Sequence, residues 1–266
     1  MSKNKYPKIS KTNNYLISFS TKEDGNMLRV SKNHVQVHKN RLLFLKKTKI
    51  NINNLFIIHS SHSPNIEVIN SKNNTYLKET YKQYPILETD LDHYYTGADG
   101  AITFSPKLSI GLISGDCVPL IIWDNISGMH GILHIGLLGT LNNMVQILPQ
   151  IFKRYNVKLK NVNFYIGPSI TQKNYNINNS SMWSLVANQV RNKIPDINEY
   201  IKIKNKIEYF NMQKMIIDQL SSFGIKKAQI QQYEFCIGDK NSIFFSHHIL
   251  KQTGEKGNFL SIIGKK

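Results

Sequence analysis

The chain has 266 residues, which is enough to bury a sizeable core, and we expect a single domain over residues 1–266. Its hydrophobic content of 41% is typical of globular proteins, and no apolar run is long enough to span a membrane, so we expect a soluble protein without a membrane partner. The basic N-terminal segment lacks the apolar stretch of a secretory signal, which predicts a cytoplasmic location. Cys117 and Cys236 form no disulfide framework, in agreement with a reducing compartment.

The formal net charge of +17 raises nucleic-acid binding as a possible function class. The lysines, however, are scattered among asparagines and isoleucines along the whole chain, and no RNA-binding motif is present. The composition therefore argues against nucleic acid as the main partner.

Short runs rich in Ile, Val, Phe and Tyr that end at Gly, Pro, Asn or Asp predict strands at residues 14–21, 54–60, 66–70, 100–105, 109–124, 128–135, 162–167, 229–235 and 258–263. Apolar residues at helical spacing predict helices at 33–46, 140–155, 180–193 and 211–223. Thr140 would cap the second helix, and Gly224 would end the last. The segment "DNISG" predicts a turn that pairs its flanking strands as a hairpin. This mixture predicts an α+β fold with a mixed sheet packed by helices.

The predicted strand 109–124 contains an unusual interruption, "LISGDCVPLII". The carboxylate of Asp116 in an apolar strand costs on the order of several kcal/mol unless it is paired or lies at a functional edge. Pro119 removes a backbone donor, so we expect the strand to be irregular or at a sheet edge just after Cys117. The interruption therefore marks the candidate site.

Cys117 is followed by His130 and His134, which lie four residues apart in the next predicted strand and so face the same side. If the intervening turn forms a hairpin, that strand runs back beside Cys117. Thiolate and imidazole together suit zinc or copper, and His59 or His62 could add a third ligand. The alternative interpretation is that Cys117 packs as an ordinary apolar residue and that the histidines are solvated or hydrogen-bonded.

Successive blocks of the sequence resemble laccase-domain proteins, namely "ADGAITFSPKLSIGLISGDCVPLIIWD", "GILHIGLLGTL", "YIGPSITQKNYNI", "FFSHH" and "TGEKGN". These proteins are also described as multicopper polyphenol oxidoreductase-like and as a purine nucleoside phosphorylase and adenosine deaminase family. The resemblance covers about residues 15–263. It implies an α+β sandwich related to bacterial toxin cysteine hydrolases. It also implies a zinc-dependent enzyme that phosphorolyses adenosine, inosine or methylthioadenosine, or that deaminates adenosine.

The resemblance also implies the site residues. In the family, a histidine before a turn, the cysteine of the "DC" block and the histidine of the "H-x-G" block bind zinc, and here these match His62, Cys117 and His134. We choose His62 over His59 because the family places its histidine a few residues ahead of a Val-rich strand, here "IEVI". Zinc is the expected metal, and copper is the alternative.

Asp99 and Asp116 match further family positions. Asp116 would orient a ligand or accept a proton, so the implied catalytic residues are Asp116 and Cys117. The expected partners are a purine nucleoside and phosphate, bound by a monomer or homodimer.

The chain departs from the family where arginines are expected. Family members commonly carry "H-A-G-W-R-G", whereas this chain has "HIGLLG", so Leu137 and Leu138 replace a tryptophan and an arginine. The family's "FFSYRR", "Q-V-H" and late "GR" have become "FFSHH", "SSH" and "GN". Arginine binds phosphate through forked donors, which leucine cannot replace, and His247 and His248 could meet an anion only when protonated. Phosphorolysis is therefore more affected by these changes than deamination.

Other functions stay open. Cys117 could be the nucleophile of a metal-free cysteine hydrolase with His134 as its base, and metal content would separate this from a zinc enzyme. Related proteins are linked to cell-wall precursor editing. The missing arginines also suggest a catalytically degenerate binding protein, in which Cys117→Ala would alter no turnover. A copper oxidase is disfavoured because one cysteine and a few histidines cannot fill several copper centres.

Overall fold

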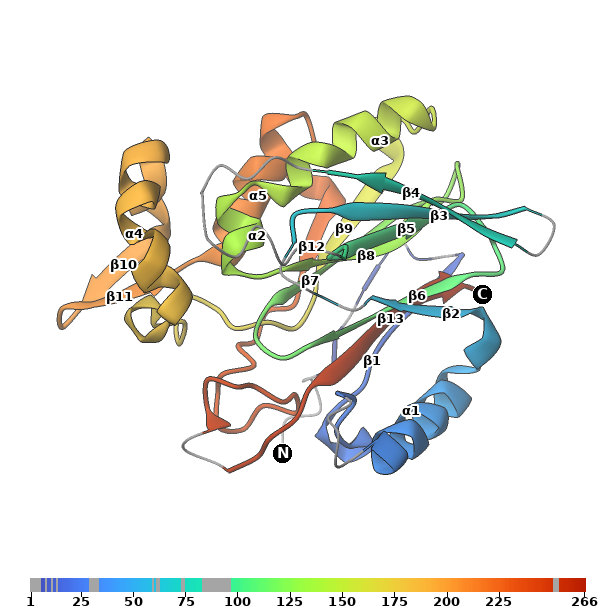
Figure 1. Cartoon of the computed structure of the whole chain (residues 1–266), viewed down its shortest axis with the longest axis horizontal. Coiled ribbons are helices and arrows are strands. Elements are labelled where there is room, and N and C mark those ends of the chain that lie inside the picture. The colour runs from blue at the N-terminus through green and yellow to red at the C-terminus, as the bar shows by residue number, and fades with distance from the viewer. Residues whose placement is uncertain are drawn as a thin grey trace.

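The computed structural model describes residues 6–7, 9–10, 12, 14–28, 34–58, 60, 63–72, 75–82, 97–250 and 254–266. Two β-sheets are stacked face to face and are covered by helices on both outer sides (Figure 1). The predicted α+β class with mixed sheets is confirmed. Within the described ranges, none of the helices has the length and apolar character needed to cross a membrane.

The larger sheet has seven strands, and its order explains how distant segments meet. From one edge to the other it runs β12 (Ile230–Gln232), β9 (Val162–Ile166), β7 (Val118–Asp124), β8 (His130–Ile135), β5 (Gly100–Thr103), β3 (Ile66–Lys72) and β4 (Thr75–Tyr81). β12 with β9 and β3 with β5 are parallel pairs, and the other pairs are antiparallel. β7 and β8 form the hairpin predicted from the "DNISG" turn.

The smaller sheet has four strands, in the order β1 (Tyr15–Phe19), β13 (Phe259–Lys265), β6 (Ser109–Ser114) and β2 (Leu55–Ile58). The last strand of the described chain therefore lies between the first strand and β6, and both of those pairs are antiparallel. A separate hairpin consists of β10 (Ile201–Lys204) and β11 (Ile207–Phe210).

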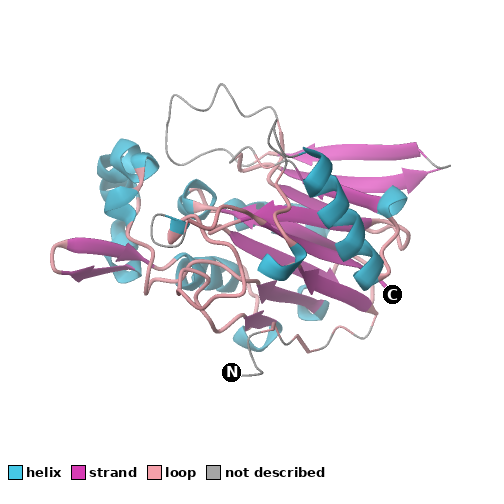
Figure 2. Cartoon of the chain, turned by 90° about the horizontal axis from the view of Figure 1, so that it is seen from below, coloured by secondary structure: helices cyan, strands magenta, loops and turns pink. Residues whose placement is uncertain are grey.

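Apolar residues fill three layers between these elements. The largest core lies between the seven-stranded sheet and α2 (Leu137–Leu141), α3 (Leu148–Arg154), α4 (Ser181–Lys193) and α5 (Met212–Ser222). A second core, which includes the fully buried Trp123, fills the space between the two sheets. A third lies under α1 (His34–Thr48), which crosses the outer face of the four-stranded sheet (Figure 2). Short 3-10 turns occur at Lys22–Asp24, Ile52–Asn54, Met144–Ile147, Leu159–Asn161, Ile177–Asn179, Pro195–Tyr200 and Lys227–Gln229.

The predicted strand 109–124 is two strands in different sheets, because the chain crosses from β6 to β7 at residues 115–117. Of the two alternatives expected near Pro119, the irregular strand is confirmed, because the strand breaks at residues 115–117, and the sheet edge is wrong, because β7 lies between β9 and β8. Pro119 is tolerated because it is the second residue of β7 and lies just beyond the last residue pair with β9, Leu120 with Ile166. Its carbonyl still accepts a hydrogen bond of 3.0 Å from the N–H of Gly167.

The predicted helix 140–155 is also divided, into α2, a 3-10 turn and α3. Asn143 has a φ of 54°, which interrupts the helical path between α2 and α3. The predicted cap at Thr140 is wrong, because Thr140 lies inside α2 and its hydroxyl donates to the carbonyl of Gly136. Gly224 follows α5 with a φ of 101°, which agrees with its predicted role of ending that helix.

Gly131 allows β5 to lie close against β8. A Cβ atom there would lie 2.2 Å from the carbonyl oxygen of Ala101 and 2.9 Å from the Cα of Ile102. We therefore expect Gly131→Ala to lower the free energy of unfolding by about 1–3 kcal/mol, as overpacking usually does. Urea unfolding monitored by far-UV circular dichroism would measure this change.

Gly139→Ala in α2 is the matched control. Its Cβ would meet no atom closer than 3.5 Å, and alanine favours a helix over glycine by about 1 kcal/mol. This variant should be neutral or slightly more stable than the wild type. Equal destabilisation by both substitutions would contradict the argument from close approach.

Candidate functional site

The ends of three neighbouring strands of the seven-stranded sheet bring Cys117, His134 and Asp99 together. Cys117 directly precedes β7, and His134 is the second-last residue of β8, which pairs antiparallel with β7. Asp99 directly precedes β5, whose first residue, Gly100, pairs with Leu133 of β8. In antiparallel pairs the start of one strand lies beside the end of the next, so three segments that are distant in sequence converge here.

Asp99 holds His134 by two hydrogen bonds. The Nδ1 atom of His134 lies 2.8 Å from Oδ2 of Asp99, and the backbone N–H of His134 donates to the Asp99 carbonyl at 2.6 Å. Both residues are almost completely buried, with 4% and 1% exposure. A carboxylate that accepts from Nδ1–H fixes the orientation of the ring and leaves Nε2 as the atom available to a ligand.

Cys117 also interacts with the imidazole and is partly exposed. Burial lowers the pKa of His134, but the charge of Cys117 and hydrogen bonds with Asp99 and Cys117 outweigh burial and raise it. The order Asp99, His134, Cys117 can serve two kinds of chemistry. It can present a nitrogen and a sulfur to a metal, or it can act as orienting group, base and nucleophile.

The donor set fits a zinc ion. Zinc prefers thiolate sulfur and imidazole nitrogen, and a histidine that binds zinc commonly donates its other N–H to a carboxylate, as His134 does to Asp99. His62, the predicted third ligand, and His59 lie outside the described residues. Among the residues with described positions, no three His, Cys, Asp or Glu side chains form a group able to hold a metal. The three-ligand set therefore stays a prediction.

The Asp116 carboxylate points to a different segment. It accepts hydrogen bonds from the hydroxyl of Ser246 at 2.5 Å and from the N–H of His248 at 2.9 Å. Burial raises the pKa of Asp116, against the opposing effects of Ser246 and the two neighbouring histidines. The carboxylate that orients His134 is therefore that of Asp99, whereas Asp116 anchors residues 246–248 beside Cys117. Its catalytic role stays a prediction.

The residues at the positions that differ from the family have separate locations. The ring of His247 packs on Gly115, where a Cβ atom would lie 2.4 Å from the imidazole. This places His247 and His248 beside the turn that carries Cys117. Leu137 and Leu138 belong to the larger core, with exposures of 7% and 4%. Consequently, the segment that follows His134 offers no cationic side chain to an anion.

His130 shares a strand face with His134 but has a structural role. Its Nδ1 and Nε2 atoms lie 3.0 Å and 2.8 Å from the carbonyl oxygens of Gly128 and Leu108. The side chain is fully buried, and its ring centroid lies 5.2 Å from that of Tyr15. His130 therefore ties the β7–β8 turn to the chain before β6.

Tyr175 is a residue to which the sequence assigned no role and whose phenol is influenced by the charges of the site. It lies in the loop after β9, within the quoted block "YIGPSITQKNYNI". Burial, and then the negative charges of Cys117 and Asp116, raise the pKa of its phenol above the ordinary value. An aromatic residue among amide and hydroxyl side chains was the only sequence signal, and it does not by itself indicate proximity to Cys117.

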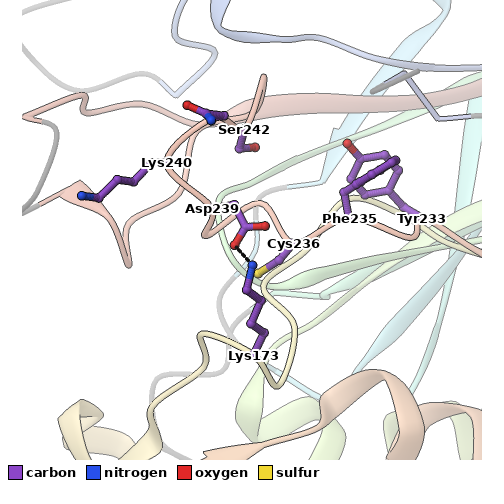
Figure 3. A pocket seen from close by; sticks show the side chains of 8 residues that line it. Lys173, Tyr233, Phe235, Cys236, Asp239, Lys240 and Ser242 are labelled. Carbon is purple, nitrogen blue, oxygen red and sulfur yellow. Dashed lines mark hydrogen bonds and ion pairs between the residues drawn. The ribbon is translucent and has the colours of Figure 1, made fainter. Parts of the chain in front are cut away.

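A separate pocket of about 400 Å³ is lined by residues from the segments that follow β9 and β12. Lys173 and Asp239 form an ion pair of 2.8 Å at its centre, beside Cys236 (Figure 3). A β-bridge pairs Cys236 of this pocket with Ser169 in the loop after β9. Because its central charges are paired, we do not assign the reaction to it.

Comparisons with known proteins place the chain in a family. Residues 15–266 match a family model described as multi-copper polyphenol oxidoreductase laccase. A purine nucleoside phosphorylase of Staphylococcus epidermidis is 26% identical over 171 residues, which cover 64% of this chain and 61% of that protein. The Bacillus subtilis purine nucleoside phosphorylase YlmD is 25% identical over 169 residues, which cover 63% of this chain and 59% of that protein. The aligned part thus spans about three fifths of these relatives.

Solved structures show that the fold is shared over more of the chain. YlmD from Geobacillus stearothermophilus aligns with a TM-score of 0.75 at 19% identity, covering 96% of this chain and 93% of that one. The Bacillus licheniformis hypothetical protein YfiH aligns with a TM-score of 0.72 at 22% identity, and the alignment covers 95% of this chain and 93% of that one. At these identities, the likeness establishes the fold.

The buried position of His130 predicts a dependence of stability on pH. Burial lowers its folded-state pKa below the unfolded value of 6.5, although the two carbonyl contacts oppose the shift. Protonation therefore favours the unfolded chain, so the stabilisation is complete above pH 6.5 and is lost as the pH falls through the lower folded pKa. The drop in unfolding free energy between about pH 7.5 and about pH 5.5 should be smaller in His130→Gln. Identical drops in the two proteins would refute this assignment.

The hydrogen bond from His134 to Asp99 predicts the effect of changing the carboxylate. Asp99→Asn removes the negative charge that fixes the imidazole, so we expect zinc affinity to fall by about 10- to 100-fold. Competition with a chelator of known affinity would measure it. Asp124→Asn is the control, because Asp124 is equally buried but accepts from the N–H groups of Ile126 and Ser127 in the β7–β8 turn. It should lower stability and leave zinc affinity unchanged.

Proposed function

Because the chain belongs to the multi-copper polyphenol oxidoreductase laccase family, we propose that it is a zinc-dependent enzyme acting on purine nucleosides. The ligands in this proposal are Cys117, His134 and His62. The observation that carries it is the buried Asp99 carboxylate, which orients His134 beside Cys117. The names of the curated relatives, purine nucleoside phosphorylases, support the substrate class.

We infer that deamination of adenosine suits the site better than phosphorolysis. Phosphorolysis needs donors that bind phosphate while it attacks C1 of the ribose, and forked arginine donors serve this best. Leu137 and Leu138 are buried in the core instead. His247 and His248 are the basic side chains beside the Cys117 turn, and they are cationic only when protonated. Attack of water on C6 of adenine requires no phosphate site.

Each residue of the site has a distinct task in this proposal. Cys117 would bind the metal through sulfur and His134 through Nε2, while Asp99 holds the Nδ1–H of the ring and so keeps the required tautomer. Asp116 keeps residues 246–248 against the turn that carries Cys117. When bound there, zinc would supply Lewis acidity, which makes water a competent nucleophile near neutral pH.

A metal-free cysteine hydrolase is the second candidate. It is favoured by the side-chain hydrogen bond between Cys117 and His134, and by the Asp99 carboxylate that holds the other ring nitrogen. This is the arrangement of nucleophile, base and orienting group. A common origin with toxin-type cysteine hydrolases would account for it, and such an origin is part of this second proposal.

Metal content separates the two candidates. We expect about one zinc per chain in the purified wild type and loss of that zinc in Cys117→Ala, since the thiolate is one of the ligands. Inductively coupled plasma mass spectrometry for zinc and copper would measure this. Cys236→Ala should keep its zinc, because the Cys236 sulfur accepts hydrogen bonds from the N–H of Thr171 and the side-chain amide of Asn174 and is not one of the proposed ligands. Absence of metal from the wild type would overturn the zinc proposal and favour the hydrolase.

The activity assay uses the same proteins. Adenosine and inosine would be incubated with and without inorganic phosphate, and the products separated by chromatography. We expect inosine to form from adenosine without phosphate, and Cys117→Ala to be inactive. Release of free base only when phosphate is present would reverse the preference for deamination.

A further inference from the structure

Asp116 fixes the position of His247 at the crossing between the two sheets. Its carboxylate accepts hydrogen bonds from the hydroxyl of Ser246 and the N–H of His248, which are the two chain neighbours of His247. The imidazole of His247 lies directly against Gly115, where a Cβ atom would be 2.4 Å from its Cδ2 and 2.8 Å from its Nε2. The Cδ2–Nε2 edge of the ring therefore faces the backbone of the crossing, and a side chain at position 115 would displace it.

Asn258, which directly precedes β13, has a side-chain amide of fixed orientation. Its own backbone N–H donates to Oδ1 of Asn26 at 2.9 Å, and its carbonyl accepts from the N–H of Met27 at 3.0 Å. The amide oxygen accepts from the N–H of Gly115 and the amide nitrogen donates to the carbonyl of Gly257, both at 3.3 Å. The opposite orientation would set oxygen against oxygen and N–H against N–H. Two backbone groups with unchangeable roles thus orient the amide.

This orientation determines which nitrogen of His247 carries the proton. The amide nitrogen of Asn258 also lies 3.3 Å from Nε2 of the imidazole. An amide N–H can only donate, so Nε2 accepts, and a neutral imidazole that accepts at Nε2 carries its proton on Nδ1. In the imidazole, Nδ1 lies across the ring from the Cδ2–Nε2 edge and so points away from Gly115. Because the side chain is exposed, this N–H is an accessible donor.

A nucleoside bound at Cys117 can reach this donor. Gly115 and Cys117 are two residues apart, so their Cα atoms are separated by at most about 7 Å. A purine nucleoside is longer than this, because it joins a bicyclic base to a ribose, and Cys117 is partly exposed. His247 and Asn258 belong to "FFSHH" and "GN", two blocks in which the chain departs from its family. Their pairing is therefore a feature of this chain.

We propose that Asn258 holds His247 as a neutral Nδ1–H donor, and that this donor binds a neutral acceptor of the nucleoside, a ribose oxygen or a ring nitrogen. The inference rests on the proposed function. It adds His247 as a substrate-binding residue and Asn258 as a positioning residue. A neutral imidazole offers a hydrogen bond without a positive charge, which suits a nucleoside better than a phosphate ion. Since the amide sets the tautomer before the substrate arrives, binding loses little in ordering the donor.

Nitrogen NMR of the imidazoles tests the positioning role. The sample is the full-length, zinc-loaded protein labelled with 15N-histidine, at a mildly alkaline pH where an imidazole in water is neutral. We expect the proton of His247 on Nδ1 in the wild type, and a return to the Nε2–H form of a free side chain in Asn258→Ala. His38, exposed on α1, should give the same signal in both proteins. Protonation at Nε2 in the wild type would overturn the proposal, whether or not Asn258→Ala folds.

The variant His247→Phe tests the binding role, because it keeps an aromatic ring against Gly115 and removes the donor. We expect the KM for adenosine to rise about three- to tenfold, as loss of one neutral hydrogen bond implies, with a smaller change in kcat. His247→Asn places an amide nitrogen near the position of Nδ1 and should restore a KM close to that of the wild type. Zinc content should be the same in all three proteins, and His38→Phe should keep the wild-type KM.

The possible outcomes separate this inference from the proposed function. An unchanged KM in His247→Phe, with an active wild type, would overturn the binding role of His247 and leave the proposed function standing. A wild type that neither converts nor binds nucleosides would overturn the proposed function, and the binding role with it.

Discussion

The pairing of β7 with β8 is the constraint on which the candidate site depends. Their register sets Val118 opposite Ile135 and Pro119 opposite His134, so Cys117 reaches the imidazole only in this register. A shift of one residue would turn His134 to the other face of the sheet. Side chains of β8 alternate between two cores, since Leu133 and Ile135 belong to the helix-covered core and Ile132 belongs to the core between the sheets. A shift of register would exchange these environments and is therefore opposed.

Burial gives the interactions of the site their strength. Asp99 and His134 lie in a region nearly closed to water, where a hydrogen bond to a charged group is stronger and an unpaired charge is costly. The carboxylate therefore has to be paired, and His134 is its partner. By contrast, Arg41 is the only buried lysine or arginine among the residues that the structure describes, and its guanidinium donates to the Met27 carbonyl.

The partly buried carboxylate of Asp116 links distant parts of the chain. Asp116 joins the crossing between the two sheets to Ser246 and His248, which are 130 and 132 residues away. Gly115 beside it leaves space for the ring of His247. The two acidic residues matched to the family thus have different partners. One orients the imidazole, and the other fixes residues 246–248, which belong to the "FFSHH" segment that stands where the family has "FFSYRR".

The sequence determined the α+β class, the β7–β8 hairpin and the presence of Cys117 and His134 near each other, because strand periodicity and turn residues act locally. It could not show that residues 109–124 divide between two sheets, since both halves are equally apolar and only tertiary packing assigns them. The same limit applies to the partners of Asp99 and Asp116 and to the position of Tyr175. Side chains in loops that are distant in sequence meet only through the order of the strands, and this order depends on burial of both sheet faces rather than on any local pattern.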